Sequence, residues 1–375
     1  MGIPLGIDGP LAVKSTLESM SAGDCIPCKY VASTSGVAGA FSELGTCVAT
    51  EIPVAGSATP GGLFYFIKAD KGLLIADRVV QHSISWDVLN AAKFIQGSIV
   101  KLTPKMTSLS QDGVTLTRSS VTSSSFEISR AFDDVLNEAN GGWQTSDSTD
   151  PKTQWCQVAL ATVQKIDRIM LQHDGQALAI QTAPKTIEVL AGMDEASLSL
   201  IATLTTVADN SLQYFKLPVT SFKVIKLRIT DIHGTANPRW TGFSEIRLLY
   251  TGMMFRSLSG GCAYADANGG KSLTNTGNGA WPVINEWDKY IVKSDLGRKI
   301  VTGSDNVWHW SGAFSLCQDT IINGILGITT GDWRTARGYT NDKLLSNKQS
   351  NLVNTSVGFR PVLEYKEDGS SIFGG

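Results

Sequence analysis

The sequence has no hydrophobic run long enough to cross a membrane, and it carries almost no net charge. The longest apolar runs, such as Leu63–Ile67, are far shorter than the about 20 residues that a spanning helix needs. Residues Met1–Met20 lack a basic segment followed by an apolar stretch, so we expect no signal peptide. The 32 basic and 34 acidic residues are interspersed and give a formal net charge of −2. We therefore expect neither membrane insertion nor a nucleic-acid partner.

Groups that could perform catalysis are also scarce. There are only four histidines, and no two of them have the H-x-x-x-H spacing of a metal site on a helix. The sequence contains no G-x-S-x-G motif, no phosphate-binding P-loop and no G-x-G-x-x-G after a predicted strand. Adjacent acids such as Asp133 and Asp134 are better explained as loop charges. We expect no enzyme, although a glycosidase with two carboxylates far apart in the sequence stays an open alternative.

Cysteine is sparse and forms no metal or redox motif. Only Cys25 and Cys28 lie close together, and the following residues Lys29–Ala32 predict a strand instead of the helix that a C-x-x-C redox site opens. A zinc site would need a second pair of ligands, which the sequence does not offer. We interpret the cysteines as structural, leaving open whether any are bridged. The six are Cys25, Cys28, Cys47, Cys156, Cys262 and Cys317.

Short alternating runs dominate the middle of the chain. In Val224–Ile229 every second residue from Ile225 onward is apolar, and the residues between them are Lys226 and Arg228. Thr186–Leu190 is a shorter run of the same kind, and so is the segment from Glu245 to Leu248. This period of two, bounded by Gly, Pro, Asn and Asp, predicts half-buried antiparallel strands. Several such strands at short spacing predict a sandwich or a barrel.

The flanks of the chain differ from its middle. Apolar spacing predicts a short amphipathic helix within Ser85–Gln96, with Ser85 as its N-cap. Asn285–Ile291 is a second candidate helix. The Ser- and Thr-rich segment Thr117–Ser125 predicts a hinge between two units, and a further break falls at Ser257–Gly261.

Six segments in the middle of the chain occur in the order and spacing of one known domain family. They are Ser123–Ser125, Arg130–Asp133, Gly142–Ser146, Gln154–Leu160, Ile166–Leu171 and Gly242–Leu248. Together they resemble the discoidin family, also called the coagulation-factor type C family. The resemblance implies a jelly-roll β-sandwich of the galactose-binding-like kind, which we place at residues 116–252. Alternation along its strand Trp155–Leu160 puts Cys156 and Val158 on the core face and Trp155 on the other.

Discoidin-like domains bind sugars, lipids or proteins through loops at one end of the sandwich, and the resemblance implies the same loops here. The ligand-binding candidates are Arg239, Trp240, His173 and Trp143. An aromatic face stacks on the C–H surface of a sugar, while Arg and His donate hydrogen bonds. The alternative role for Trp143 is packing in the core, and the alternative for His173 is a solvated position in a turn. Arg239 and Trp240 are the better candidates for ligand contact. Their alternative role is structural, with the Arg239 side chain stacked on the ring of Trp240.

The discoidin resemblance also implies a structural calcium beside the loop that precedes Trp143. Its ligands would be Asp133 and Glu245 with nearby backbone carbonyls, because calcium binds oxygen ligands. The sequence departs from the family at Asp134, where many relatives have Gly, and at Val135–Glu138, where the usual acidic pattern is missing. The alternative is a capped loop without a metal.

The two flanks carry a second resemblance, to the C-type-lectin-like fold of formylglycine-generating enzymes. The segments that lie in the order of that fold are Val79–Ala91, Trp281–Tyr290, Asn306–Trp310, Arg334–Tyr339 and Gly358–Leu363. We expect one lectin-like α+β domain, residues 1–115 and 253–375, split by the inserted sandwich. The enzymes use a pair of cysteines late in the fold, whereas only Cys317 occurs there in this sequence, so we expect no catalysis. Arg337 and Arg360 would be buried ties between loops.

Gly23–Cys28 and Gly358–Tyr365 also resemble segments of bacteriophage tail and virion proteins. The resemblances together imply a mainly β protein with some helix that belongs to a virion, as a tail fibre, tail tip or baseplate protein, and binds host-surface carbohydrate without catalysis. Its partners would be a host glycan and other virion proteins, and avidity would favour a homo-oligomer. The alternative is a structural decoration or fibre protein whose domains contact neighbouring subunits.

Overall fold

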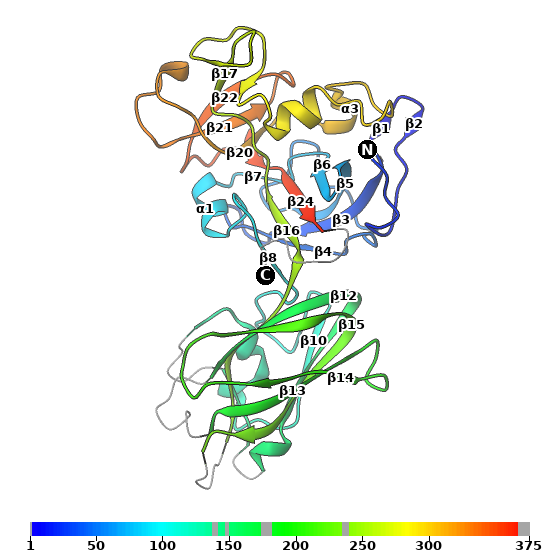
Figure 1. Cartoon of the computed structure of the whole chain (residues 1–375), viewed down its shortest axis with the longest axis vertical. Helices are drawn as coiled ribbons and strands as arrows, with labels where there is room; N and C mark the ends of the chain where they lie inside the picture. Colours follow the sequence, from blue (N-terminus) through cyan, green and yellow to red (C-terminus); the bar gives the residue numbers. More distant parts are fainter. Residues whose placement is uncertain (1, 137–141, 147–149, 174–181, 235–239, 367–375) are drawn as a thin grey trace. The chain divides into compact units, whose positions relative to one another are not determined.

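The computed structural model describes residues 2–136, 142–146, 150–173, 182–234 and 240–366. They form two compact units (Figure 1). The split unit contains the chain up to Ser98 and from Met253 onward, and the sandwich unit runs from Ile99 to Gly252. The two flanks of the sequence thus fold together, and the middle folds by itself. The first junction lies before the expected residue 115, because Val114–Arg118 pairs with a strand of the sandwich unit.

The sandwich unit consists mainly of strands. These strands are β8 (Ser98–Lys101), β9 (Ser110–Gln111), β10 (Val114–Arg118), β11 (Trp143–Gln144), β12 (Trp155–His173), β13 (Pro184–Gly192), β14 (Ser199–Thr205), β15 (Gln213–Ile232) and the first part of β16 (Gly242–Ser257). Its 3-10 helices are η1 (Ser124–Phe126), η2 (Ile128–Phe132) and η3 (Pro151–Thr153). The predicted mainly β fold is confirmed by these elements and by the β-rich split unit.

Two long strands form the frame of the sandwich. β12 pairs with β15 along most of its length, with a register shift between Ala159 and Gln164. Before this shift β12 pairs with β10 on its other edge, and after it β12 pairs with β16. β15 in turn pairs with β13, and β13 with β14. The β12–β15 pair therefore connects β10, β13 and β14 with β16, and residues from these strands share one hydrophobic core.

The alternation in Val224–Ile229 places its side chains as predicted. Ile225 and Ile229 are buried in the core, whereas Lys226 lies on the outer face. The Nζ atom of Lys226 is 4.1 Å from the ring centroid of Trp155, so Trp155 covers the outer face. Burying one such isoleucine stabilises the fold by about 1.5–3 kcal/mol. A register slip of one residue would therefore be costly, because it exchanges the two faces.

The split unit contains short strands with a few helical turns. Its strands are β1 (Leu5–Gly6), β2 (Gly9–Pro10), β3 (Cys25–Val31), β4 (Ala40–Ser42), β5 (Gly61–Asp70), β6 (Leu73–Ala76), β7 (Gln81–His82), β17 (Ala263–Ala265), β18 (Lys271–Ser272), β19 (Ala280–Trp281), β20 (Phe314–Thr320), β21 (Trp333–Gly338), β22 (Leu345–Gln349), β23 (Val357–Phe359) and β24 (Pro361–Tyr365). Its helical segments are α1 (Trp86–Ala91), η4 (Trp287–Val292), α3 (Asp305–Trp308) and η5 (Ile325–Gly327).

The two flanks share both larger sheets of the split unit. One sheet has the order β4-β3-β5-β6-β24 and continues to the end of β16, and the other has the order β22-β21-β20-β23-β7. In the first, Leu74 of β6 lies opposite Leu363 of β24. In the second, His82 of β7 lies opposite Gly358 of β23. Neither flank can therefore complete its sheets without the other. The likeness of this unit to C-type lectins stays a prediction.

Both predicted helical segments of the flanks are present. α1 begins at Trp86, and Oγ of its N-cap Ser85 accepts a hydrogen bond from the backbone N of Val88 at 3.2 Å. η4, at Trp287–Val292, covers most of the second predicted segment. Its Trp287 is fully buried, which fixes this turn against the core of the split unit.

Buried arginines surround Trp287, as the lectin-like resemblance implied for Arg337 and Arg360. Both guanidinium carbons lie 5.6 Å from the Trp287 ring centroid. Arg360 donates through Nη1 to the carbonyl of Ala76 at 2.9 Å and through Nη2 to that of His309 at 3.1 Å. Burial lowers the pKa of Arg360 to about 10, which still leaves it charged at neutral pH. Arg360 thus ties residues from both flanks together.

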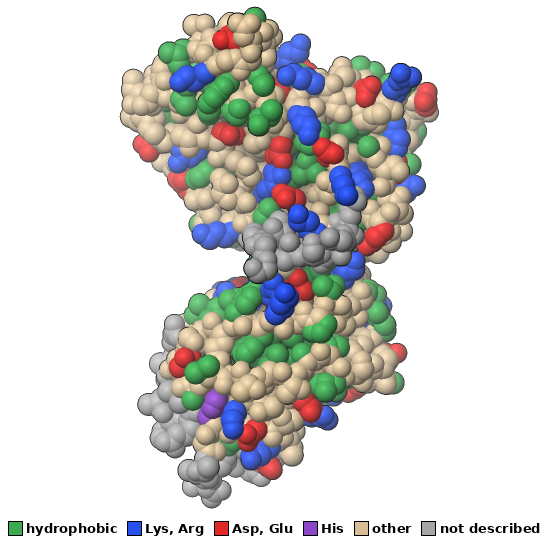
Figure 2. All heavy atoms as spheres, viewed as in Figure 1, with side chains coloured by type: hydrophobic (Ala, Val, Ile, Leu, Met, Phe, Trp, Pro, Cys, Tyr) green, Lys and Arg blue, Asp and Glu red, His purple; other side chains and the backbone are tan. Residues whose placement is uncertain are grey.

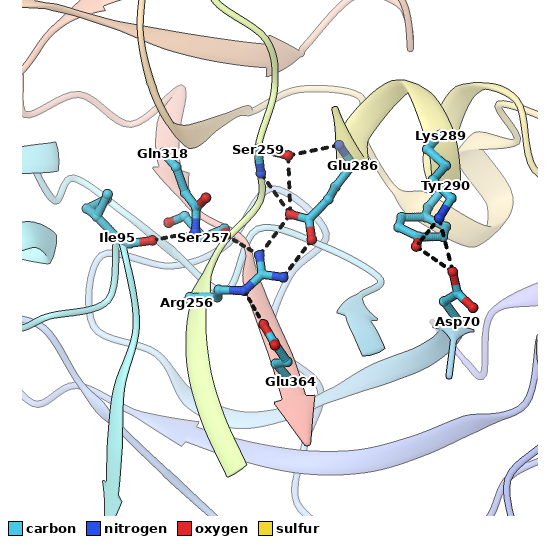
Figure 3. A network of polar contacts seen from close by, with 10 residues as sticks. All are labelled: Asp70, Ile95, Arg256, Ser257, Ser259, Glu286, Lys289, Tyr290, Gln318 and Glu364. Carbon is cyan, nitrogen blue, oxygen red and sulfur yellow. Dashed lines mark hydrogen bonds and ion pairs between the residues drawn. The ribbon is translucent and has the colours of Figure 1, made fainter. Parts of the chain in front are cut away.

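A third arginine, Arg256, holds the end of β16 in the split unit (Figure 3). Arg256 donates two hydrogen bonds to the carboxylate of Glu286, at 2.8 and 2.6 Å, and one to Glu364 at 2.9 Å. Ser259 contributes its backbone N to the same Glu286 carboxylate at 2.9 Å. β16, β24 and the segment before η4 are thereby joined at one side chain, which is 10% exposed.

We expect Arg256→Met to destabilise the split unit by about 2–4 kcal/mol, because two carboxylates lose their shared cation. The matched control is Lys289→Met in a separate group of contacts of the same unit: Lys289 binds Asp70 at 3.1 Å with about half of each side chain exposed (Figure 3). Such an exposed pair is worth about 0–1 kcal/mol. Hydrogen exchange of β24 peptides in the full chain measures the change in stability of both variants. Equal losses of stability in the two variants would contradict the role given to Arg256.

The six cysteines carry free thiols, and five of them are buried. Cys25 and Cys28 lie three residues apart on β3, so their side chains are on opposite faces of the strand. Burial raises the pKa of Cys25 to about 12 and that of Cys28 well above its ordinary value, which makes both thiols unreactive. Within the described ranges, the structure contains no helix with the length and apolar character needed to cross a membrane.

Candidate functional site

The ends of several strands meet at one end of the sandwich unit. His173, the last residue of β12, lies opposite Phe243 of β16. Pro184 at the start of β13 lies opposite Ile232 at the end of β15. β11 adds Trp143, also opposite Phe243. We call this set of strand ends the strand-end site.

Two histidines join these strand ends. The rings of His173 and His233 have centroids 6.0 Å apart and are nearly perpendicular. His173 is 1% exposed, and its ring also stacks on Phe243 at 6.3 Å. Neither ring nitrogen of His173 has a hydrogen-bond partner among the described residues. Burial lowers the pKa of His173 to about 4; the charge of His233 adds to this, and the backbone of Val207 has a smaller opposing effect. His173 is therefore neutral at pH 7.

His233 is held by a threonine from the end of β14. Thr206 Oγ1 donates its single proton to the carbonyl of Pro184 at 2.5 Å. The contact of 2.9 Å between Thr206 Oγ1 and Nε2 of His233 must then have the histidine as donor. Neutral His233 accordingly carries its proton on Nε2, and its Nδ1 is an acceptor. Burial also lowers the pKa of His233.

Threonines fix the backbone beside Trp240. The backbone N of Thr145 donates to the carbonyl of Thr241 at 2.9 Å, and the backbone N of Thr241 donates to Oγ1 of Thr145 at 2.9 Å. Oγ1 of Thr241 donates to the carbonyl of Thr182 at 2.6 Å. Trp240 itself is half-buried, so it keeps part of its surface for a ligand. The other predicted loop contact, Arg239, lies outside the described residues.

The structure corrects two predicted contact residues. Trp143 is fully buried in the core, and its Nε1 donates to the carbonyl of Ser120 at 3.0 Å. His173 is almost fully buried and is not a solvated turn residue. Neither side chain has an exposed surface that a ligand can contact. Both therefore have a structural role beneath the site. Of the four candidates, Trp240 is the one that the structure describes with accessible surface.

The calcium site that the resemblance implies at Asp133 and Glu245 stays a prediction. Oε1 of Glu245 accepts from Nε of Arg247 at 2.8 Å, whereas its Oε2 is buried without a hydrogen-bond partner among the described residues. Burial raises the pKa of Glu245 to about 7, against the opposing effect of Arg247. Oδ1 of Asp133 accepts from the backbone N of Val135 at 2.9 Å and caps the turn. The described part of the chain has no group of three acids, histidines or cysteines that could hold a metal, whereas calcium takes about six to eight oxygens.

Two residues of the strand-end site have no signal in the sequence. Thr206 and His233 follow different strands and are 27 residues apart, and neither belongs to a motif. They meet because β13 pairs with both β14 and β15. Only knowledge of this strand order could have placed the threonine hydroxyl beside the imidazole.

Several similar solved structures each cover about a third of this chain. CpGH89CBM32-5 from Clostridium perfringens, solved in complex with GalNAc-β-1,3-galactose, is 16% identical, with 36% of this chain and 94% of that chain covered and a TM-score of 0.31. A family 32 module of C. perfringens in complex with galactose is 18% identical, with coverage of 36% and 93% and a TM-score of 0.30. Chitosan-binding module 1 of a chitosanase/glucanase from Paenibacillus sp. IK-5 is 22% identical, with coverage of 36% and 94% and a TM-score of 0.30.

By sequence, a match is found within the sandwich unit. A comparison with curated proteins finds no match. A scan against family models finds one that covers the sandwich unit from the middle of β10 to the middle of β16. Residues 115–246 match the F5/8 type C domain.

Proposed function

We propose that the sandwich unit binds carbohydrate at the strand-end site, without catalysis. The observation that carries the proposal is the F5/8 type C match over the residues that form the sandwich. The discoidin resemblance implies binding through loops at one end of this fold, and the strand-end site is the end at which these loops start. Trp240 offers a partly exposed aromatic surface there, which suits the C–H face of a sugar ring.

The backbone beside Trp240 is held in place, and the two histidines of the strand-end site add no charge to it. The hydrogen bonds between Thr145 and Thr241 fix the adjoining backbone, so little conformational entropy is lost when a ligand binds. His173 and His233 both have lowered pKa values and are neutral at pH 7. The site therefore offers aromatic surface and hydrogen-bonding groups without a fixed charge from these histidines.

We expect Trp240→Ala to weaken carbohydrate binding by about tenfold or more, because the stacking surface is removed. Isothermal titration of the full chain with galactose, GalNAc-β-1,3-galactose and chitotriose measures the effect; related sugars are named with the similar solved structures. The control is Val163→Ala, which removes part of a 50% exposed side chain at the bend of β12, away from the strand ends.

The outcomes separate the two parts of the proposal. Loss of affinity in Trp240→Ala with unchanged affinity in Val163→Ala supports the strand-end site. Equal affinity in wild type and Trp240→Ala contradicts this site. Absence of binding to these sugars and to a broad glycan array contradicts carbohydrate recognition by the chain altogether.

We propose further that the chain belongs to a bacteriophage virion, as a tail or surface protein that adheres to a host glycan as a homo-oligomer with other virion proteins. The motif resemblances of the two flanks support this setting. Antibody labelling of particles from the source of the sequence, combined with adsorption in the presence of free sugar, tests it. If the particles are labelled but free sugar does not change their adsorption, the alternative of a structural virion protein is favoured. If the particles are not labelled, both the adhesion role and the structural role in a virion are contradicted.

A further inference from the structure

Two positively charged residues lie opposite each other in the five-stranded sheet of the split unit. Arg334 of β21 and Lys348 of β22 are cross-strand partners, so their side chains share one face of the sheet. Like charges directly opposite each other destabilise a strand pair. Neither cation forms an ion pair with any described residue. The repulsion is therefore left without a compensating carboxylate inside this part of the chain.

Each of the two cations rests on an aromatic ring. The guanidinium carbon of Arg334 is 4.3 Å from the ring centroid of Trp86, and Nζ of Lys348 is 3.9 Å from that of Phe314. These rings position the charges but do not neutralise them. Nε of Arg334 is buried and has no hydrogen-bond partner among the described residues. Burial lowers the pKa of Lys348, whose Nζ donates to Oγ of Ser346 at 3.1 Å.

Tyr339 extends this aromatic surface from a strained backbone. Its φ of +85° is a conformation that residues with side chains rarely adopt. The ring stacks on Phe314 with centroids 4.7 Å apart and is 37% exposed. Hydrogen bonds fix the backbone: Tyr339 N donates to the carbonyl of Trp310 at 2.8 Å, and Gly312 N donates to that of Tyr339 at 3.0 Å. Strain of this kind is kept where the position of a side chain serves a function.

We propose that this surface, which we call the cation–aromatic face, binds a saccharide that carries carboxylates. It is formed by Trp86, Phe314, Arg334, Tyr339 and Lys348. A carboxylate between the two cations removes their repulsion through charge-assisted interactions. The half-buried ring of Trp86 and the exposed ring of Tyr339 contact the C–H surface of the sugars, while the buried Phe314 supports Tyr339 and Lys348 from below.

No acid of the described chain fills this role. Asp87 follows Trp86 on α1, and its Oδ2 accepts from Oγ of Ser350 at 3.0 Å. It forms no ion pair with Arg334 or Lys348. The anion must therefore come from outside these residues. Because the cation–aromatic face shares no residue with the strand-end site, this inference does not rest on the function proposed above.

Titration of the full chain with polygalacturonate tests the proposal, with the methyl-esterified polymer as its neutral counterpart and polyphosphate as an anion without sugar rings. We expect polygalacturonate to bind, and the other two polymers to bind at least about tenfold more weakly. The double variant Arg334→Gln/Lys348→Gln should lose at least about tenfold in affinity. Lys343→Gln, at an exposed lysine of the same unit, should change little.

Tyr339→Gly separates binding from folding. Glycine adopts a φ of +85° without strain, so the backbone should keep its shape, while removal of the ring should weaken binding several-fold. Unchanged affinity in the double variant, or equal binding of the methyl ester, overturns the proposal, and preferential binding of polyphosphate overturns its saccharide part. Trp240→Ala should leave polygalacturonate binding intact, so failure here and failure of the strand-end site are distinguishable.

Discussion

Replacing Arg337 by Met is expected to destabilise the split unit by about 3–5 kcal/mol. Arg337 is fully buried, and its Nη2 binds Oδ1 of the equally buried Asp288 at 2.6 Å. Its Nη1 donates to the carbonyl of Gly260 at 2.7 Å and its Nε to that of Leu344 at 3.1 Å. Methionine fills much of the volume but leaves a buried carboxylate without its cation and two carbonyls without their donor. Leaving such groups unsatisfied is the costly part.

Urea unfolding of the full chain, followed by hydrogen exchange of peptides from β20 to β24, measures the Arg337→Met loss. Lys343→Met, at an exposed position in the same unit, should stay within about 0.5 kcal/mol of the wild type. The double variant Arg337→Met/Asp288→Leu should recover part of the loss, because it removes both charges. A loss below about 1 kcal/mol in Arg337→Met would show that Asp288 does not depend on Arg337.

Acid is expected to weaken the sandwich unit through His173 by up to about 3 kcal/mol. The pKa of His173 is about 4 in the folded chain, against an ordinary value of 6.5. Between these values the unfolded chain binds the extra proton, so this contribution to stability falls as the pH drops from about 6.5 to about 4. Glu245 acts in the opposite direction, since its folded pKa is raised to about 7. A variant of His173 is therefore needed to isolate the effect.

His173→Phe is the matched variant, because phenylalanine can keep the stack on Phe243 without titrating. Hydrogen exchange of β12 and β16 peptides, corrected for intrinsic rates, gives the stability of the sandwich unit at pH 7 and pH 4.5. The difference between wild type and variant should grow by about 2–3 kcal/mol over this interval. Parallel pH dependences in the two proteins would mean that His173 is solvated enough to take up its proton in the folded state.

Local sequence features predict where the helices and strands of this fold lie better than they predict which strands pair. The period of two in Val224–Ile229 and the N-cap at Ser85 depend on neighbours in the chain, and both predictions are confirmed. The pairing of β6 with β24 brings Leu74 opposite Leu363 across the whole inserted unit. No local pattern encodes that pairing, because any apolar strand satisfies the hydrogen bonds of another.

The candidate site could be predicted only in part, for a related reason. Residue type points to Trp240 and to His173, but exposure decides their roles, and the stack of His173 on Phe243 follows from the strand pairing. The ion pair between Glu245 and Arg247 could have been predicted from the sequence. Arg247 is two residues further along the same strand, so its side chain is on the same face as that of Glu245.

The sharing of both sheets by the two flanks sets an order of events during synthesis. β6 leaves the ribosome early, yet its partner β24 follows the 154 residues from Ile99 to Gly252 and about a hundred more. At about 5–20 residues per second, the sandwich unit alone occupies about 8–30 s of translation. The sandwich unit can complete its own pairing in that time, while β6, whose residues are all buried in the finished fold, has β5 on one edge and no strand on the other. Slow translation or a shortage of chaperones should therefore harm the N-terminal flank first.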